Sequence, residues 1–217
     1  MLKTTFILIL LSGLIYLGTS KVTLPQTENK TLSYNEYLDS LSKQKSAIDS
    51  GDFDLAKKLL FETINDHIPS YWIGTKWNFN GTSQTPKSGT IACGYFLTTV
   101  MKQTGYNIER VKMAQQASSV LINAYCTDIK TLGSKEKIKA YLAAQPDSSV
   151  FILGLDFHVV FVAKNGSDNQ IIHSNYIDNM GVVKENFDNA QVLSKNTFFM
   201  IGNLSANTKK MNEWMGW

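Results

Sequence analysis

The sequence predicts an α+β protein in which helices come first and an antiparallel sheet follows. Amphipathic helical patterns run from about residue 33 to residue 144 of the 217-residue chain. Short apolar runs bounded by turn residues then fill the last third and are typical of strands. Helices and strands that are segregated along a chain, instead of alternating, favour an antiparallel sheet. The length fits one domain with some appended helix.

Residues 1–20 have the pattern of a secretory signal peptide. Lys3 precedes an apolar run over residues 6–17, and small residues follow at 18–20. The run is short for a transmembrane helix, and an uncleaved N-terminal anchor is the alternative. Residues 21–32 are polar and predict a flexible leader. We therefore expect a secreted or periplasmic protein that makes no stable membrane insertion after cleavage of the signal.

A helical hairpin is predicted over residues 33–69. Ser33 is a candidate N-cap with Glu36 at capping-box spacing, and apolar residues recur after it at helical spacing. Residues 50–52 are expected to end the first helix and to cap a second one. The second helix has its own amphipathic pattern, and Pro69 is expected to end it. Because no second copy of the hairpin occurs, a helical solenoid is not expected. The hairpin should instead pack on the rest of the chain.

Residues 70–217 are expected to form the main domain. It should contain helices at about 93–104, 109–124 and 134–144, and strands at the apolar runs 150–153, 159–162, 171–172 and 198–201. An aromatic, turn-rich stretch precedes the first of these helices. We expect its residues Tyr71, Trp72 and Trp77 to line a substrate-binding cleft. The alternative interpretation is that both tryptophans lie in the core.

Cys93 is the candidate nucleophile because it begins a predicted helix. The helix dipole and the free N–H groups of a helix start favour the thiolate form of a cysteine. A nearby histidine can accept the thiol proton, and a further polar residue can fix the tautomer of that histidine. The chain has only three histidines, and two of them, His158 and His173, flank a predicted hairpin.

The predicted hairpin brings the two histidines together. An Asn-Gly sequence at 165–166 is a strong signal for a tight turn. With this turn, His158 lies directly opposite His173, with Cβ atoms about 5 Å apart. Asp156 then lies opposite Asn175 on the same face, and both compete as partners of His158. A longer loop with an odd shift would send the histidines to opposite faces. The alternative for each residue alone is an ordinary surface polar group.

Composition and motif searches exclude several other classes of function. The formal net charge is only +3 and the basic residues are scattered, so the sequence gives no argument for a nucleic-acid partner and none is expected. Short metal-ligand pairs, phosphate-binding glycine loops and serine-hydrolase elbows do not occur, and no metal and no cofactor are expected. Cys126, the second cysteine, is expected to be a buried and inert thiol. A Cys93–Cys126 disulfide is the alternative in an exported protein.

The residues around the cysteine and the histidines resemble a known family. The segments are GTIACGYF at 89–96, FHVVFV at 157–162 and IIHS at 171–174. They are similar to the papain-like cysteine peptidases of the NlpC type, which are largely exported bacterial cell-wall enzymes. The resemblance covers about residues 70–205. The family commonly has Asp-Cys-Ser at its nucleophile, where this chain has Ala-Cys-Gly.

The resemblance implies a papain-like fold and a cysteine peptidase or amidase that acts on peptides of the bacterial cell wall, or peptidoglycan. Cys93 would be the nucleophile, His158 the base and His173 the orienting residue. The backbone N–H of Cys93 would donate one hydrogen bond to the oxyanion, and a residue of the 71–80 segment would donate the second. The protein is expected to act as a monomer. The alternatives are a non-catalytic module that binds glycan or peptide, and an acyltransferase or esterase on the same scaffold.

Overall fold

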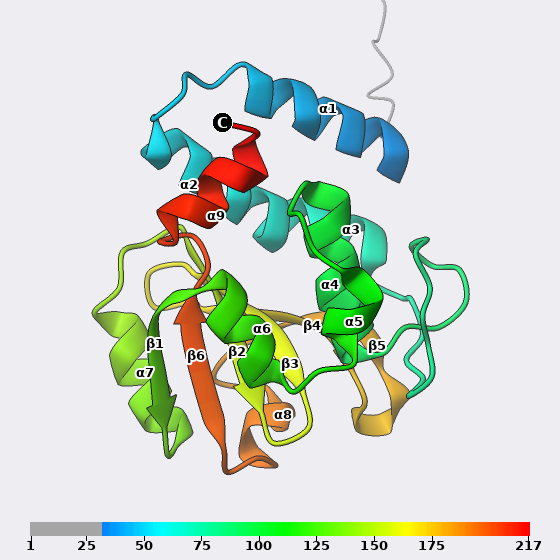
Figure 1. Cartoon of the computed structure of the whole chain (residues 1–217). Coiled ribbons are helices and arrows are strands. Elements are labelled where there is room, and N and C mark those ends of the chain that lie inside the picture. The colour runs from blue at the N-terminus through cyan, green and yellow to red at the C-terminus, as the bar shows by residue number, and fades with distance from the viewer. Residues whose placement is uncertain (1–31) are drawn as a thin grey trace, which may run out of the picture. The chain divides into compact units, whose positions relative to one another are not determined.

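The described chain is built on one six-stranded antiparallel sheet with helices on both faces (Figure 1). The computed structural model describes residues 32–217. The predicted signal peptide, and all of the predicted leader except its last residue, lie outside the described residues. Every strand pair is antiparallel, and most helices precede the sheet, which confirms the predicted α+β class. Within residues 32–217, no helix has the length and apolar character that a membrane span requires.

Neighbouring strands in the sequence form most of the sheet. The strands are β1 (Thr127–Leu132), β2 (Ser149–Leu155), β3 (Val159–Lys164), β4 (Gln170–Asn175), β5 (Gly181–Asn186) and β6 (Phe199–Asn203). The helices are α1 (Tyr34–Ser46), α2 (Phe53–Glu62), α3 (Ile68–Trp72), α4 (Cys93–Thr104), α5 (Arg110–Ala114), α6 (Ser118–Tyr125), α7 (Lys135–Ala143), α8 (Gln191–Ser194) and α9 (Thr208–Met215). The strand order β1-β6-β2-β3-β4-β5 makes β2 to β5 a continuous meander.

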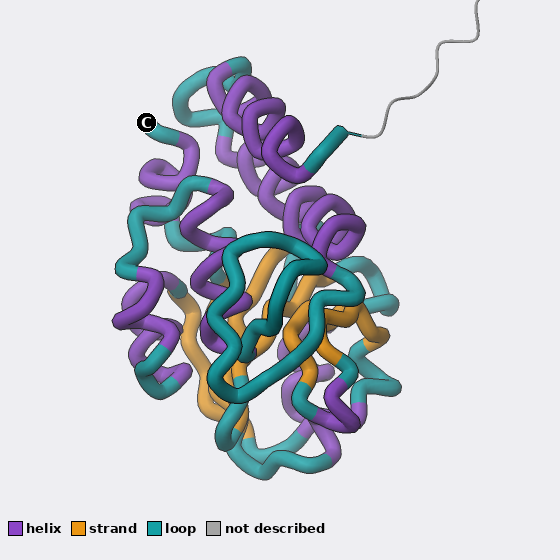
Figure 2. The backbone as a smooth tube through the Cα atoms, turned by 90° about the vertical axis from the view of Figure 1, so that its right-hand side faces the viewer, coloured by secondary structure: helices purple, strands orange, loops and turns teal. Residues whose placement is uncertain are grey.

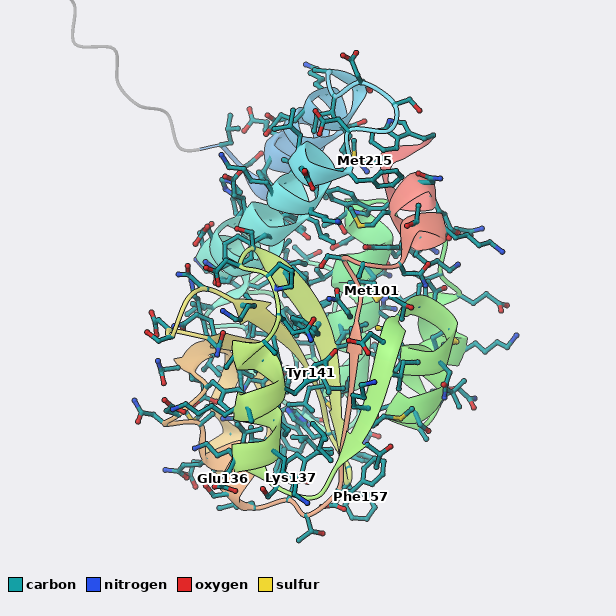
Figure 3. All side chains as sticks on the ribbon, turned by 90° about the vertical axis from the view of Figure 1, so that its left-hand side faces the viewer. Met101, Glu136, Lys137, Tyr141, Phe157 and Met215 are labelled. Carbon is teal, nitrogen blue, oxygen red and sulfur yellow. The ribbon has the colours of Figure 1, made fainter. Side chains whose placement is uncertain are left out.

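Two apolar clusters cover the two faces of the sheet. Ile152 and Phe161 face the cluster that holds α1 to α4, α6 and α9. Leu153 and Val162 point the other way, toward α7 and α8, where Tyr141 of α7 lies against the sheet (Figure 3). Strands β2 and β3 are therefore buried along their whole length. Burial on both faces explains why their sequences are continuous apolar runs without polar alternation.

The N-terminal hairpin begins as the sequence predicts and ends later. Ser33 caps α1 in a full capping box with Glu36. Helix α2 continues through a π-helical turn (η1, Thr63–His67) into α3, so the prediction that Pro69 ends the helix is wrong. Pro69 lies in the first turn of α3, where its missing N–H is tolerated. The hairpin contributes to the same apolar cluster as α4 and the sheet.

The predicted helix over 109–124 is wrong because the chain breaks into α5 and α6. Gly94 of α4 lies against the end of α5, where a Cβ on Gly94 would be 2.5 Å from the carbonyl oxygen of Ala114. The chain turns there and becomes extended at Ala117, with ψ of 143°. Packing between the two helices, and not local propensity, thus decides where α5 stops.

Two strands, β1 and β5, are not anticipated by the sequence analysis. They are the two edge strands of the sheet and are only partly buried. Their sequences are therefore mixed and lack the long apolar runs of β2 and β3. The loop over residues 73–92 runs beside β5, since the Val182 N–H donates to the Thr75 carbonyl at 2.8 Å (Figure 2).

The two tryptophans of the aromatic stretch should differ in their contribution to stability. Trp72 is fully buried in the core, whereas Trp77 is half-buried in the loop. We expect Trp72→Ala to lower the free energy of unfolding by ~3–5 kcal/mol, and Trp77→Ala to lower it clearly less. Urea unfolding of the two variants measures both values. Equal losses would contradict the assignment of Trp72 alone to the core.

Candidate functional site

Cys93 begins α4, as the sequence predicts, and the backbone before it is held on several sides. The Ile91 N–H donates to the Lys76 carbonyl at 2.9 Å, and the Ala92 N–H donates to the Gly81 carbonyl at 2.9 Å. The Ser174 hydroxyl of β4 donates to the Ile91 carbonyl at 2.7 Å. The start of the helix is thereby fixed against both the loop and the sheet. The helix predicted to start at Cys93 from its periodicity is thus confirmed.

The thiol of Cys93 lies against the first residue of β3. It interacts with the backbone N–H of Val159, with that of Gly94 and with its own N–H, and these interactions lower its pKa. Burial acts in the opposite direction and is the larger effect, so the pKa of Cys93 is raised above 9.0. The helix start therefore favours the thiolate as predicted, but burial outweighs this effect, so the expected low-pKa thiol is not found in the free protein. Cys93 carries a neutral thiol near neutral pH.

The hairpin between the histidines differs from the predicted one by two residues. Phe161 pairs with Ile172, and the connecting loop spans residues 165–169, so the Asn-Gly sequence does not form a two-residue turn. In this register His158, just before β3, lies across from Asn175 and diagonal to His173. The shift is even, so both histidines stay on one face. The predicted contact between them is confirmed, although the predicted register is wrong.

His158, His173 and Glu185 form a hydrogen-bonded chain across β3, β4 and β5. Nε2 of His158 lies 2.7 Å from Nδ1 of His173. Nε2 of His173 lies 2.7 Å from a carboxylate oxygen of Glu185. Both histidines are buried, and Glu185 is partly buried. Asn175 joins the cluster by donating from Nδ2 to the same carboxylate oxygen at 3.3 Å.

The carboxylate end of the chain determines the tautomer of each histidine. A carboxylate only accepts hydrogen bonds, so His173 donates from Nε2 and presents an unprotonated Nδ1. His158 then donates from Nε2 to that nitrogen, which leaves Nδ1 of His158 as a lone pair. This Nδ1 is buried and has no hydrogen-bond partner among the described residues. Leaving it unsatisfied costs about 1–3 kcal/mol, and such costs persist most often where they serve a function.

Both histidines are neutral near neutral pH. Burial lowers the pKa of His158 well below 6.5, and the neighbouring His173 lowers it further. Burial also lowers the pKa of His173, although the hydrogen bond to Glu185 opposes that shift. The buried chain thus holds an imidazole that is free to accept a proton. An imidazolium formed there would be stabilised through His173 by the Glu185 carboxylate.

The thiol and the imidazole of His158 are neighbours through the backbone. The thiol binds the N–H of Val159, the residue that follows His158. Within residues 32–217 no hydrogen bond joins the Cys93 sulfur to the His158 imidazole, whose unpartnered nitrogen is Nδ1. Hydrogen bonds between a nucleophile and its base are often loose before substrate binds. The backbone N–H of Val159 is thus the established link between the neutral thiol and the residue that carries the free nitrogen and the fixed tautomer.

One of the three predicted cleft aromatics lies at this site. Trp77 packs on Tyr176 with ring centroids 6.4 Å apart, and Tyr176 packs on His158 at 5.2 Å. Trp72 is a core residue, so its predicted place in the cleft is wrong. Tyr71 instead packs on α1 and donates from its hydroxyl to the Leu32 carbonyl. Packing against the hairpin thus removes two of the three from the cleft.

Of the two alternative partners predicted for His158, Asp156 lies outside the histidine cluster and Asn175 lies inside it. Asp156 is exposed, and its carboxylate accepts from the backbone N–H of Thr197 at 2.7 Å, away from the histidines. Its predicted position beside Asn175 is therefore wrong, because the tight β2–β3 turn directs it outward. Next to it, Phe157 projects into solvent and is 96% exposed (Figure 3). Asn175 does lie in the cluster, where it donates a hydrogen bond to Glu185.

Glu185 is the residue that sequence reasoning missed. It lies on β5, which is not predicted as a strand, so nothing placed it beside His173. A weak signal exists, since Val182-Val183-Lys184-Glu185 follows Gly181 and could begin an edge strand. The register of β4 with β5 puts Glu185 opposite Ile171 and diagonal to His173 on the same face.

The two cysteines are free thiols and lie in different environments. Cys126 is buried beside Gly202, where a Cβ on the glycine would lie 3.3 Å from the Cys126 sulfur. Burial raises the pKa of Cys126 far above 9.0, which fits the predicted inert thiol. In the described part of the chain, no group of three histidine, cysteine or acidic residues could hold a metal ion.

Comparisons with known proteins identify no relative of this chain. No protein-family model, no curated protein and no solved structure matches the chain.

The buried histidines should make the folded chain sensitive to acid. Their pKa values are lower in the folded than in the unfolded state, so the unfolded chain binds more protons below about pH 6.5. We expect the free energy of unfolding to be fully maintained above that pH and to fall as the pH drops toward about 5. Thermal unfolding followed by circular dichroism measures this loss. The exposed His67 provides a control, since His67→Gln should retain the same dependence, and a melting temperature that is constant across the range would refute it.

Proposed function

We propose that this protein is a cysteine hydrolase that cleaves an amide bond. The observation that carries the proposal is the Glu185–His173–His158 chain, which ends in a buried lone pair beside the backbone that binds the Cys93 thiol. A thiol, a base and a group that orients the base are the parts that thiol catalysis needs. No described residue outside this cluster combines them.

The first chemical step joins the Cys93 sulfur to the substrate carbonyl carbon. Because thiol and imidazole are both neutral, Nδ1 of His158 takes the thiol proton as the sulfur attacks. The tetrahedral oxyanion accepts from the Cys93 N–H, and such a donor is worth ~3 kcal/mol of barrier. The carbon–nitrogen bond then breaks, and His158 returns the proton to the departing amine. Water, deprotonated by the same nitrogen, hydrolyses the thioester and frees the thiol.

The loop over residues 73–92 forms the wall beside the nucleophile. Its carbonyl groups at Lys76 and Gly81 bind the residues just before Cys93, and Trp77 reaches the histidines through Tyr176. We assign the second oxyanion donor to the 71–80 segment, at the part next to Lys76. Trp77 then contacts the substrate as a partly exposed aromatic ring.

The substrate class follows from the resemblance to NlpC-type papain-like peptidases and from the predicted signal peptide. We propose a papain-like fold and a peptide of the bacterial cell wall as substrate, processed outside the cytoplasm by a monomer. An acyltransferase or esterase would use the same thioester and differ only in the leaving group or the acceptor.

A non-catalytic binding module is the second candidate. The raised pKa of Cys93 favours it, as does the lack of a hydrogen bond between thiol and imidazole among the described residues. In that case Trp77→Ala would weaken binding of cell-wall fragments, whereas Cys93→Ala would change neither binding nor any product. Product formation by the wild-type protein decides between the two.

Cys93 should react with iodoacetamide faster than Cys126. Cys93 is partly accessible, whereas Cys126 is buried and its pKa is raised further. Because the Cys93 pKa is also raised, its rate should still be climbing above neutral pH, by about tenfold per pH unit. Mass spectrometry of timed digests measures both rates, and the unfolded protein provides the reference. Faster labelling of Cys126, or equally slow labelling of both, would remove Cys93 as nucleophile.

Substitutions in the hydrogen-bonded chain of His158, His173 and Glu185, and of Cys93, should reduce turnover to different degrees. His158→Ala should be as damaging as Cys93→Ala because nucleophile and base act as one unit. His173→Ala should leave partial activity. Glu185→Gln should lower kcat by ~10²–10⁴-fold with little change in KM, since an amide can donate to His173 and reverse the tautomers.

Amine release from a panel of cell-wall peptides provides the assay for these variants. Glu136→Gln on α7 is the matched control, because Glu136 is exposed and lies on another part of the chain (Figure 3). If Glu185→Gln behaves like Glu136→Gln, the carboxylate plays no part in orienting the histidines. If Asn175→Ala is crippling while His173→Ala is silent, the orienting role belongs to Asn175.

A further inference from the structure

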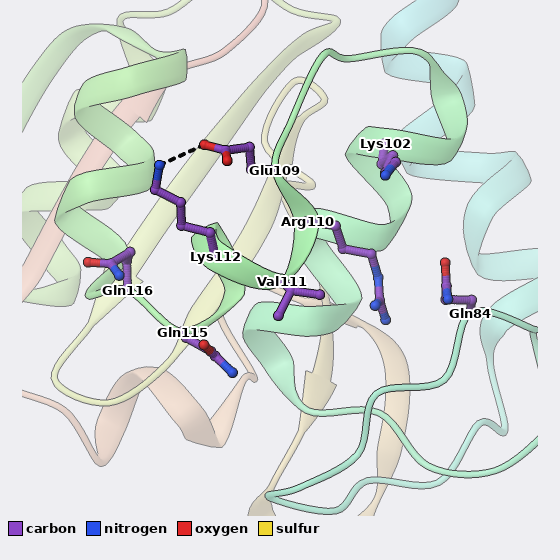
Figure 4. A pocket seen from close by; sticks show the side chains of 8 residues that line it. All are labelled: Gln84, Lys102, Glu109, Arg110, Val111, Lys112, Gln115 and Gln116. Atoms are coloured by element: carbon purple, nitrogen blue, oxygen red, sulfur yellow. Dashed lines mark hydrogen bonds and ion pairs between the residues drawn. The ribbon is translucent and has the colours of Figure 1, made fainter.

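A second polar site lies on the flank of α4, between α5 and the loop before α4. It is a cavity of about 610 Å³ lined by Gln84, Lys102, Glu109, Arg110, Val111, Lys112, Gln115 and Gln116. Figure 4 shows the Arg110 side chain between Val111 and Gln84. We refer to this cavity as the Arg110 pocket. None of its residues takes part in the proposed catalytic chain.

Arg110 is a buried cation with no acidic partner among the described residues. The residue as a whole is 8% exposed. Nε donates to the Thr99 hydroxyl at 2.7 Å, and Nη2 donates to the carbonyls of Thr82 at 2.7 Å and Ser83 at 3.2 Å. The guanidinium also lies over the ring of Tyr95, 5.0 Å from its centroid. These contacts fix its orientation but leave its positive charge uncompensated.

One nitrogen of Arg110 remains free to bind a ligand. Nη1 makes no hydrogen bond with the described residues and is not sealed from solvent. Burial lowers the pKa of the guanidinium, and the neighbouring Tyr95 opposes that shift. A negatively charged group in the pocket would supply the acidic partner that Arg110 lacks among the described residues.

The other charges of the pocket also leave an excess of positive charge. Lys112 pairs with Glu109 at 2.7 Å, so these two residues neutralise each other (Figure 4). Lys102 forms no ion pair within the described chain, and it lines the same cavity as Arg110. The side-chain amide of Gln84 adds a neutral donor. The side chains of Gln115 and Gln116 also line the cavity, so two uncompensated cations and three amides surround it.

We infer that the Arg110 pocket binds a carboxylate group of a ligand. The Nη1 group of Arg110 and the ammonium of Lys102 provide the charge, and Gln84 provides a further hydrogen bond. A phosphate site would usually add several backbone N–H donors, often at a helix start, whereas the free donors identified in this pocket are side-chain groups. The carboxylate is either the C-terminus of a peptide or an acidic side chain. This inference does not depend on the proposed hydrolase activity, because binding is measured without turnover.

The test is a titration of the ¹⁵N-labelled full chain with N-acetylglycine, followed by NMR. N-acetylglycinamide, which lacks the carboxylate, is the matched neutral probe. The third probe is N-acetylaspartic acid α-amide. Its α-carboxyl is blocked as an amide, so its one carboxylate is on the side chain. We expect shifts at the backbone amides of α5 with either acid and none with the neutral probe. The acid that binds more tightly identifies the source of the carboxylate.

Two exposed valines supply a matched pair of variants. Val111 lines the pocket and is 52% exposed, whereas Val120 on α6 is 44% exposed and lies outside it. We expect Val111→Glu to weaken N-acetylglycine binding about tenfold or more by placing a competing carboxylate in the pocket, and Val120→Glu to change it less than about twofold. Equal effects of the two variants, binding of the neutral probe, or equally strong shifts with inorganic phosphate would overturn the inference.

Discussion

The hydrogen bond between Glu185 and His173 is the interaction on which the candidate site depends. A lone histidine pair could place its single shared proton in either direction. The carboxylate removes that choice, since it can only accept, and the effect passes through His173 to His158. The consequence appears at the far end, where Nδ1 of His158 is an unprotonated nitrogen buried without a partner.

The sheet makes this network possible by holding three strands in register. Strand β4 lies between β3 and β5 and receives hydrogen bonds from both, so His173 is fixed between the other two members. Burial of β2 and β3 on both faces leaves these strands little freedom to shift. The pairing of β3 with β4 ends at Phe161 and Ile172. Beyond this end, the backbone N–H of Val159 in β3 contacts the thiol of Cys93. The site therefore lies where the two strands separate.

The electrostatics of the thiol favour a base-assisted reaction over a preformed ion pair. Backbone N–H groups at the start of α4 stabilise the thiolate, but removal from water outweighs them and raises the pKa of Cys93. The same removal from water keeps His158 neutral. A neutral pair is less reactive at rest, and in the proposed mechanism the proton would move only when attack on a carbonyl begins. Arg110 on α5 shows another consequence of burial in this protein, since its fixed charge lies beside an open cavity between α5 and the loop before α4.

The sequence by itself determined the class of the fold, the capped start of α1, the start of α4 at Cys93 and the contact between the two histidines. These features follow from periodicity, capping residues and the parity of side chains along a strand, all of which are local. Only the tertiary structure decided the register of the hairpin, the burial of Trp72, the outward direction of Asp156 and the place of Glu185. Each of these depends on packing between segments far apart in the chain. An edge strand such as β5 gains its order from its neighbour more than from its own residues, and so a local pattern could not bring Glu185 to His173.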